Sequence, residues 1–227
     1  FVAVNLHPAD ARKHGAIPLV GDARAVLGQL TRALAGCRVP ASHRAAVARH
    51  RAAWDTTRAG LVAPKRGVPL TQAQVIEALN RDCGAEGTVI HASGGIPGDI
   101  HKLWRSNAAN DYHSEYGYSC MGYEIAGALG IKLAAPERRV YAFLGDGSYL
   151  MLHTEIVTAV QEGLDLTIVL CDNHGFGCIN GLQGGCGGNA FGNEFRHRTD
   201  TNRGHRGPAG HRLWEHQRND IRSQYRI

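Results

Sequence analysis

Two polar turns in the sequence carry the residue types of a divalent cation site. Gly145-Asp146-Gly147 places a carboxylate in a glycine-rich turn, and 25 residues separate that turn from Asn173. Carboxylate and amide oxygens suit Mg²⁺, which proteins usually bind through few side chains together with phosphate groups. The pair therefore predicts a site where magnesium meets a phosphorylated ligand, although either turn alone is more often an ordinary strand end.

The segments around these turns predict how the two residues come together. Residues 140–144 form a continuous apolar run typical of a buried parallel strand, and residues 166–171 are predicted to be a second buried strand. Residues 149–162 between them have a helical pattern. A helix of about 14 residues covers about 20 Å, close to the length of a six-residue strand, so the second strand starts beside the first and runs parallel to it. Asp146 and Asn173 are then expected at one carboxyl edge, roughly 5 Å apart, where open α/β sheets bind ligands.

This pattern resembles the thiamine diphosphate motif of the superfamily that contains acetolactate synthase and pyruvate oxidase. The resemblance implies an α/β fold with a parallel sheet flanked by helices, and the cofactors thiamine diphosphate and Mg²⁺. It implies that Asp146, Asn173 and the backbone carbonyl of Gly175 bind the metal. Gly145, Asp146, Gly147, Ser148 and Asn173 are the implied cofactor-binding residues of the motif, with Ser148 expected to contact the diphosphate.

Two other segments are assigned to the cofactor through the same resemblance. Gly94 and Gly95 follow a predicted strand at residues 88–92 and are expected near the diphosphate, although from the residues alone a simple turn is the better interpretation. Met121 lies in a segment similar to one that touches the aminopyrimidine ring in the superfamily. Without the resemblance, Met121 would be interpreted as a core residue.

Several longer strings resemble the inositol-catabolic trihydroxycyclohexanedione hydrolase branch of the superfamily. They include GDIHKLWR, YHSEYGYSCMGYEIAGALGIK and DNHGFGCINGLQ, and the resemblance covers roughly residues 1–198. It implies hydrolysis of a carbon–carbon bond in a cyclic 1,2-diketone derived from myo-inositol, giving 5-deoxyglucuronate. The implied chemistry is covalent: the thiazolium carbon adds to a ring carbonyl, the adjacent bond cleaves, and water releases the acid.

The activating residue that the resemblance implies has no counterpart in this sequence. The superfamily uses a glutamate from an N-terminal domain, usually donated across a dimer interface, so the catalytic residue is unknown here. We therefore expect the chain to be a fragment without that domain, inactive alone, and the full-length protein to be a homo-oligomer.

Two other functions remain open from the sequence. A carboligase of the acetolactate synthase or glyoxylate carboligase type would share every cofactor residue named above, and a noncatalytic cofactor-binding subunit would need a partner to supply the glutamate. A dinucleotide site is disfavoured because the glycine turn lacks the third glycine of GxGxxG, and no GxxxxGK[ST] loop occurs. The 13 His and six Cys show no zinc-ligand spacing.

Composition shifts predict four regions along the chain. Residues 1–37 are similar to the end of the superfamily's central domain, with Asp22 expected to cap a helix. Residues 38–69 are predicted to be a linker, and residues 70–198 an incomplete cofactor-binding domain. Residues 199–227 form an atypical basic tail without an apolar period, expected to be disordered or out of frame.

Charge and composition limit the partners and the location. The net charge is +5, but the last 29 residues hold six Arg and only three acidic residues, so the rest of the chain lacks a strongly basic face for nucleic acid. No apolar run approaches a membrane span, and the six cysteines form no CxxC pair, as in reduced cytosolic proteins. We expect a cytoplasmic protein with a small cyclic diketone substrate and neither nucleic acid nor membrane partners.

Overall fold

The computed structural model describes residues 1–64 and 70–196, and the backbone of residues 213–217. The chain divides into two compact units, residues 1–55 and 56–227, with the division inside α3 (Ala41–Val62). These contacts do not test the four predicted regions, whose boundaries stay predictions. Across the described ranges, no helix is both long and apolar enough to cross a membrane.

The first unit contains a two-stranded parallel sheet and its connections. β1 (Val2–Asn5) pairs with β2 (Ile17–Val20). Between the strands lie α1 (Pro8–Ala11) and the short helix η1 (Lys13–Gly15), and α2 (Ala23–Ala33) follows the second strand. Parallel strands need such a crossover because a tight turn reverses chain direction.

The cap of α2 forms as the sequence predicted, but the unit has little core. The Asp22 carboxylate accepts a hydrogen bond from the Ala25 N–H at 3.0 Å. Among the described residues of this unit, Ala11 alone is buried in an apolar environment. The exposed large apolar side chains of the two strands, α2 and their neighbours are Phe1, Val2, Leu6, Ile17, Val20, Leu27 and Leu34.

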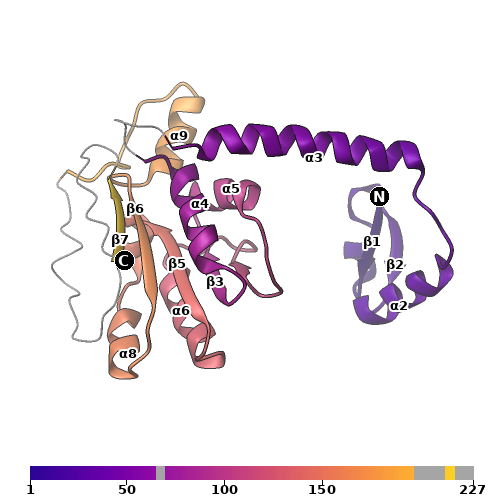
Figure 1. Ribbon diagram of the computed structural model, residues 1–227, viewed down its shortest axis with the longest axis horizontal. Coiled ribbons are helices and arrows are strands. Elements are labelled where there is room, and N and C mark those ends of the chain that lie inside the picture. Colours follow the sequence, from indigo (N-terminus) through magenta and orange to yellow (C-terminus); the bar gives the residue numbers. More distant parts are fainter. Residues whose placement is uncertain (65–69, 197–212, 218–227) are drawn as a thin grey trace. The chain divides into compact units, whose positions relative to one another are not determined.

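The second unit is built on a five-stranded parallel sheet (Figure 1). Its order is β4-β3-β5-β6-β7, and every neighbouring pair is parallel. The strands are β3 (Gly87–His91), β4 (Tyr112–Ser114), β5 (Arg139–Gly145), β6 (Thr167–Asp172) and β7 (Leu213–Gln217). The predicted α/β class is confirmed.

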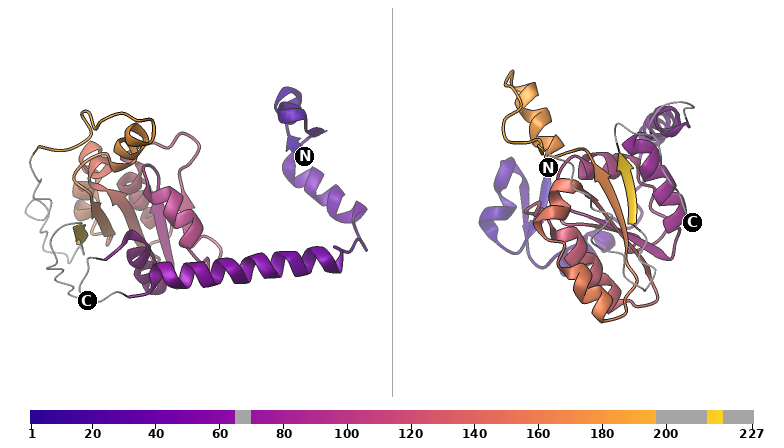
Figure 2. Two further views of the ribbon diagram at one scale, coloured as in Figure 1. Left: turned by 90° about the horizontal axis from the view of Figure 1, so that it is seen from above. Right: turned by 90° about the vertical axis from the view of Figure 1, so that its left-hand side faces the viewer.

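Helices cover both faces of this sheet, as Figure 2 shows. α4 (Gln72–Cys83) and α5 (Ile96–Leu103) pack on one face, with Ile76 and Ile100 fully buried. α6 (Tyr123–Ala134) and α8 (Glu155–Gln161) pack on the other, with Ile125 fully buried. Because β3, β5 and β6 are covered on both sides, their residues are buried in continuous runs and not at alternate positions.

The strand order creates a switch point between β3 and β5. The chain passes from β3 to its neighbour β4, then crosses to β5 on the opposite side of β3 and continues outward to β6. Ligands of open α/β sheets bind outside the carboxyl ends of the strands where the direction of winding reverses. The turns that follow β3 and β5 flank this position.

The predicted single helix over residues 149–162 is wrong. The structure has α7 (Asp146–Met151), which starts directly after β5, and then α8. Leu152, with φ −153° and ψ 85°, is not helical and ends α7. It lies so close to Gly122 that a Cβ on that glycine would come within 2.8 Å of the Leu152 Cβ. Tertiary packing therefore breaks a segment that helical periodicity alone would continue.

Part of the basic tail belongs to the sheet. Residues 213–217 form β7, which pairs with β6 in register Ile168↔Leu213 to Asp172↔Gln217. Residues 197–212 and 218–227 lie outside the described residues, and so does most of the predicted tail. The prediction that the tail is disordered or out of frame stays a prediction for those segments.

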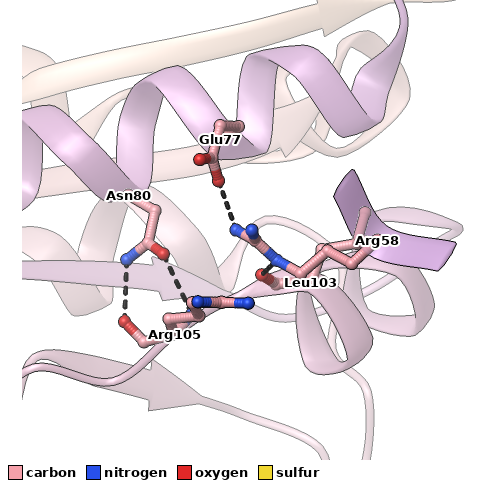
Figure 3. A network of polar contacts seen from close by, with 5 residues as sticks. All are labelled: Arg58, Glu77, Asn80, Leu103 and Arg105. Carbon is pink, nitrogen blue, oxygen red and sulfur yellow. Dashed lines mark hydrogen bonds and ion pairs between the residues drawn. The ribbon is translucent and has the colours of Figure 1, made fainter. Parts of the chain in front are cut away.

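A polar network joins the end of α3 to α4 and α5 (Figure 3). Arg58 is 6% exposed; its Nε donates to the Leu103 carbonyl at 2.9 Å, and its guanidinium pairs with Glu77. Beside it, the Asn80 amide donates to the Arg105 carbonyl and accepts from the Arg105 N–H, both at 2.9 Å. The network therefore holds the end of α5 against α4 through backbone groups.

Arg58→Ala is expected to destabilise the chain by about 2–3 kcal/mol, because it leaves a buried carbonyl and a partly buried carboxylate without their charged partner. Urea unfolding measures the change. Arg51→Ala, on the exposed side of the same helix, is the matched control and is expected to change stability by less than about 0.5 kcal/mol. Equal effects of the two substitutions would contradict the anchoring role.

Candidate functional site

Asp146 lies at the centre of the candidate site, at the carboxyl end of β5. Its side chain is 4% exposed. Oδ1 accepts the Gly147 N–H at 3.0 Å, and Oδ2 accepts the Gly175 N–H at 2.8 Å. The second bond joins the turn after β5 to the turn after β6, so the two predicted turns do meet at one edge.

Asn173 and Gly175 complete a cluster of polar atoms around Asp146. One terminal atom of the Asn173 amide lies 3.2 Å from Asp146 Oδ1 and 2.7 Å from the Gly175 carbonyl oxygen. With the amide nitrogen at that point the two contacts are hydrogen bonds, and with the amide oxygen there three oxygens converge. Without a cation the hydrogen-bond partners favour the first orientation, whereas a bound cation would favour the second.

In the second orientation the carboxylate, the amide and the carbonyl would each present an oxygen, and such a set fits a hard cation such as Mg²⁺. Over the described ranges of the chain, no group of three or more His, Cys, Asp or Glu side chains could hold a metal ion. A cation at Asp146 would therefore depend on the Asn173 amide and the Gly175 carbonyl, with further ligands from a bound phosphate or water.

The turn that carries Gly175 is held by a short antiparallel contact. Gly175 bridges to Glu194, the Phe176 N–H donates to the Asn193 carbonyl at 2.7 Å, and the Phe195 N–H donates to the His174 carbonyl at 3.1 Å. Gly175 has φ 142°, and a Cβ there would lie 2.1 Å from the Asn193 oxygen. Only glycine fits this turn, so the position of the Gly175 carbonyl depends on its having no side chain.

The electrostatics of the site disfavour the charged form of Asp146. Burial and the adjacent carboxyl group of Asp172 raise the pKa of Asp146 to about 6. The sheet register that pairs Gly145 with Cys171 brings these two acids together. A divalent cation would relieve both causes of the shift, since it screens the repulsion and compensates the buried charge.

The glycine pair after β3 leaves space beside the switch point. Gly94 has φ 94°, and neither Gly94 nor Gly95 would bring a Cβ within 4 Å of another atom. Gly147 differs, because a Cβ there would lie 2.8 Å from the Phe176 ring. The first pair therefore keeps a surface open to a ligand, while Gly147 allows close packing inside the protein.

A family comparison agrees with this geometry. Residues 92–206 match the family described as thiamine pyrophosphate enzyme, C-terminal TPP binding domain, and this match covers half of the chain. The chain belongs to this family. The matched segment includes the turns after β5 and β6, and the Gly94-Gly95 turn after β3.

Individual relatives are more specific. The chain is 39% identical to 3D-(3,5/4)-trihydroxycyclohexane-1,2-dione hydrolase 2 of Bacillus cereus. It is also 39% identical to 3D-(3,5/4)-trihydroxycyclohexane-1,2-dione hydrolases of Bacillus anthracis and Bacillus thuringiensis. In each case the similarity covers 89% of this chain and 35% of the relative, so the chain spans about a third of the length of these relatives.

Ser148 has a different environment in this TPP binding domain from the one the sequence suggested. Its side chain is 3% exposed; the hydroxyl donates to Glu124 Oε2 at 2.7 Å and accepts the Gly122 N–H at 2.7 Å. The Ser148 hydroxyl therefore already donates its hydrogen bond to a protein group. Contact between Ser148 and a diphosphate stays a prediction, and would use the backbone N–H unless the bond to Glu124 breaks.

The structure brings three of the predicted site residues together, and it places Met121 in a separate turn. Asp146, Asn173 and Gly175 form one cluster. Met121 is half-buried in the turn before α6, next to Gly122, and its contact with the cofactor stays a prediction.

Sequence reasoning missed two acidic residues of the site, Asp172 and Glu124. Asp172 accepts the His174 N–H at 3.0 Å and raises the pKa of Asp146. Glu124 is fully buried in the first turn of α6. Its signal in the sequence was the one acidic residue of a helix made mostly of apolar and small residues, where solvent exposure is the usual interpretation.

Proposed function

We propose that this chain is the cofactor-binding part of a thiamine diphosphate- and Mg²⁺-dependent hydrolase that opens a cyclic 1,2-diketone in myo-inositol catabolism. The observation that carries the proposal is the cluster of Asp146, Asn173 and Gly175 at the carboxyl ends of β5 and β6, next to the sheet's switch point, in a chain of this family. The substrate comes from the names of relatives that are 39% identical, which are trihydroxycyclohexanedione hydrolases.

In this proposal each residue has a defined task. Asp146, Asn173 and the Gly175 carbonyl hold Mg²⁺ against the diphosphate, while the open turn at Gly94 and Gly95 lets the diphosphate approach the backbone. Met121 supports the aminopyrimidine ring. When bound, thiamine diphosphate supplies a nucleophilic carbon and an electron sink for cleavage of a carbon–carbon bond.

The catalytic assembly extends beyond these residues. The glutamate that activates the cofactor is proposed to come from an N-terminal domain, across the interface of a cytoplasmic homo-oligomer. The 227-residue polypeptide alone is therefore expected to bind the cofactor without turning over the diketone.

A carboligase of the acetolactate synthase type is the second candidate, because it would use the same metal and diphosphate residues. The names of the relatives favour the hydrolase. The discriminating observation is the substrate: a cyclic diketone for the hydrolase, and 2-oxo acids such as pyruvate or glyoxylate for the carboligase.

The proposed function is tested by calorimetric titration of the 227-residue chain with thiamine diphosphate, with Mg²⁺ and then with EDTA. Binding is expected with Mg²⁺ only. Activity is then measured on the diketone and on pyruvate after adding the N-terminal part of the Bacillus cereus relative. Absence of binding would refute the cofactor role, and activity on pyruvate alone would favour the carboligase.

Metal binding is expected to weaken at acid pH because the proton and Mg²⁺ compete for Asp146. Its pKa is raised to about 6, so the carboxylate form dominates above pH 7 and the protonated form below pH 5. Each unit of pH below 6 should then cost about tenfold in apparent Mg²⁺ affinity. Titrations between pH 5 and 8 measure this, and a constant affinity from pH 5 to 7 would contradict it.

A further inference from the structure

Glu124 is a buried carboxylate with no ion-pair partner in the described part of the chain. Its exposure is 0%, and neither the ion pair between Lys13 and Asp10 nor that between Arg58 and Glu77 involves it. Burial of a carboxylate without a counter-charge is costly unless hydrogen bonds replace its water. Burial raises the pKa of Glu124, and its hydrogen bonds oppose that shift.

Those hydrogen bonds come from three separate segments. Oε1 accepts the N–H of Ser93, in the turn after β3, at 3.3 Å. Oε2 accepts the N–H of Gly122, just before α6, at 3.1 Å, and the hydroxyl of Ser148, in α7, at 2.7 Å. One side chain thus joins the glycine turn after β3 to the motif after β5, on the two sides of the switch point.

Gly122, Glu124 and Ser148 are also hydrogen-bonded to one another in all three pairs. The Gly122 N–H donates to both Glu124 Oε2 and Ser148 Oγ, and the Ser148 hydroxyl donates to Glu124 Oε2. Each of the three groups therefore holds the other two. Glu124 also lies in the first turn of α6, where the helix dipole favours a negative charge.

An apolar side chain could fill this place in the core without the cost of a buried charge, but it could not hold three segments by hydrogen bonds. The segments that Glu124 holds are those that the proposed function assigns to the cofactor. Ser93 precedes Gly94 and Gly95, Gly122 follows Met121, and Ser148 follows Gly147.

We infer that Glu124 is a positioning residue for the cofactor, and that it sets the spacing between the turn after β3 and the motif after β5. This inference rests on the proposed function. Glu124 acts through Ser93, Gly122 and Ser148 and is not itself a ligand of the diphosphate or of the metal.

The test compares E124Q and S148A with the wild-type 227-residue chain. E124Q keeps the size of the side chain but replaces one acceptor oxygen by a donor, so at least one of the three segments loses its bond. E162Q, an exposed glutamate after α8, is the matched control. The dissociation constant for thiamine diphosphate with saturating Mg²⁺ is measured well below the melting temperature of every variant, and hydrogen exchange reports the Ser93 and Gly122 amides.

E124Q is expected to raise the dissociation constant at least about tenfold and to accelerate exchange at Ser93 and Gly122 by a similar factor, as for loss of a bond to a charged group. S148A should have a smaller effect that does not add fully to that of E124Q in the double variant. E162Q should stay within about twofold of the wild type. A merely structural role would lower the melting temperature and leave the affinity unchanged.

Wild-type affinity in folded E124Q, or unchanged exchange at both amides, would overturn the inference. If E124Q does not fold, S148A provides the test. Wild-type affinity of S148A for thiamine diphosphate, together with unchanged hydrogen exchange at the Gly122 amide, would overturn the inference. If the wild-type chain itself binds no thiamine diphosphate, the proposed function fails. The exchange rates still decide whether Glu124 holds the two turns.

Discussion

Asp146→Asn is expected to abolish Mg²⁺-dependent binding of thiamine diphosphate, with a dissociation constant at least about 100-fold higher. The substitution removes the one charged member of the Asp146, Asn173 and Gly175 cluster and places an amide that also has a donor beside the proposed metal position. Loss of a charged, buried contact of this kind costs about 3 kcal/mol, which corresponds to that factor. Calorimetry at pH 8 measures it.

The fold of the same variant should survive. The pKa of Asp146 in the folded chain is raised above its unfolded value, so its contribution to stability is present at low pH and is lost as pH rises through about 6. At pH 8 the buried carboxylate is a cost in the cofactor-free chain, which offsets the hydrogen bond that asparagine loses. The melting temperature should change little.

Asp165→Asn, at an exposed position shortly before β6, is the matched control and should bind like the wild type. Retention of Mg²⁺-dependent binding by Asp146→Asn would contradict the metal site. A large fall in melting temperature without cofactor would instead show that Asp146 is needed mainly for folding.

Gly175→Ala is expected to destabilise the chain by about 3 kcal/mol or more and to reduce cofactor binding with it. The new Cβ would lie 2.1 Å from the Asn193 oxygen, and the backbone has φ 142°, which an alanine rarely adopts. The turn must therefore open, which moves the carbonyl oxygen that the proposal assigns to Mg²⁺. Urea unfolding of the cofactor-free chain measures the loss.

Gly130→Ala provides the matched control in the same unit. Gly130 is exposed within α6, and a Cβ there would meet no atom within 4 Å. Alanine is the better helix former, so this variant should be more stable than the wild type by about 0.5–1 kcal/mol. If Gly175→Ala were as stable as Gly130→Ala, the close contact between the Gly175 and Asn193 turns would be contradicted.

Local pattern was sufficient for the elements that carry the motif. The apolar runs at residues 140–144 and 166–171 are strands, and they are parallel neighbours. Buried parallel strands are recognisable because both faces are covered, so nearly every residue of the run is apolar. Because the two strands are parallel, their carboxyl ends lie at one edge of the sheet, and this places Asp146 close to Asn173.

The sequence by itself determined the fold class, the family resemblance and the edge of the sheet where the candidate site lies. Tertiary structure alone decided the break between α7 and α8, the strand at residues 213–217 and the three contacts of Glu124. Helix and strand periods depend on residues close in the chain, whereas these features depend on partners far away. Glu124 meets Ser93 and Ser148, 31 and 24 residues from it, and no local period records such contacts.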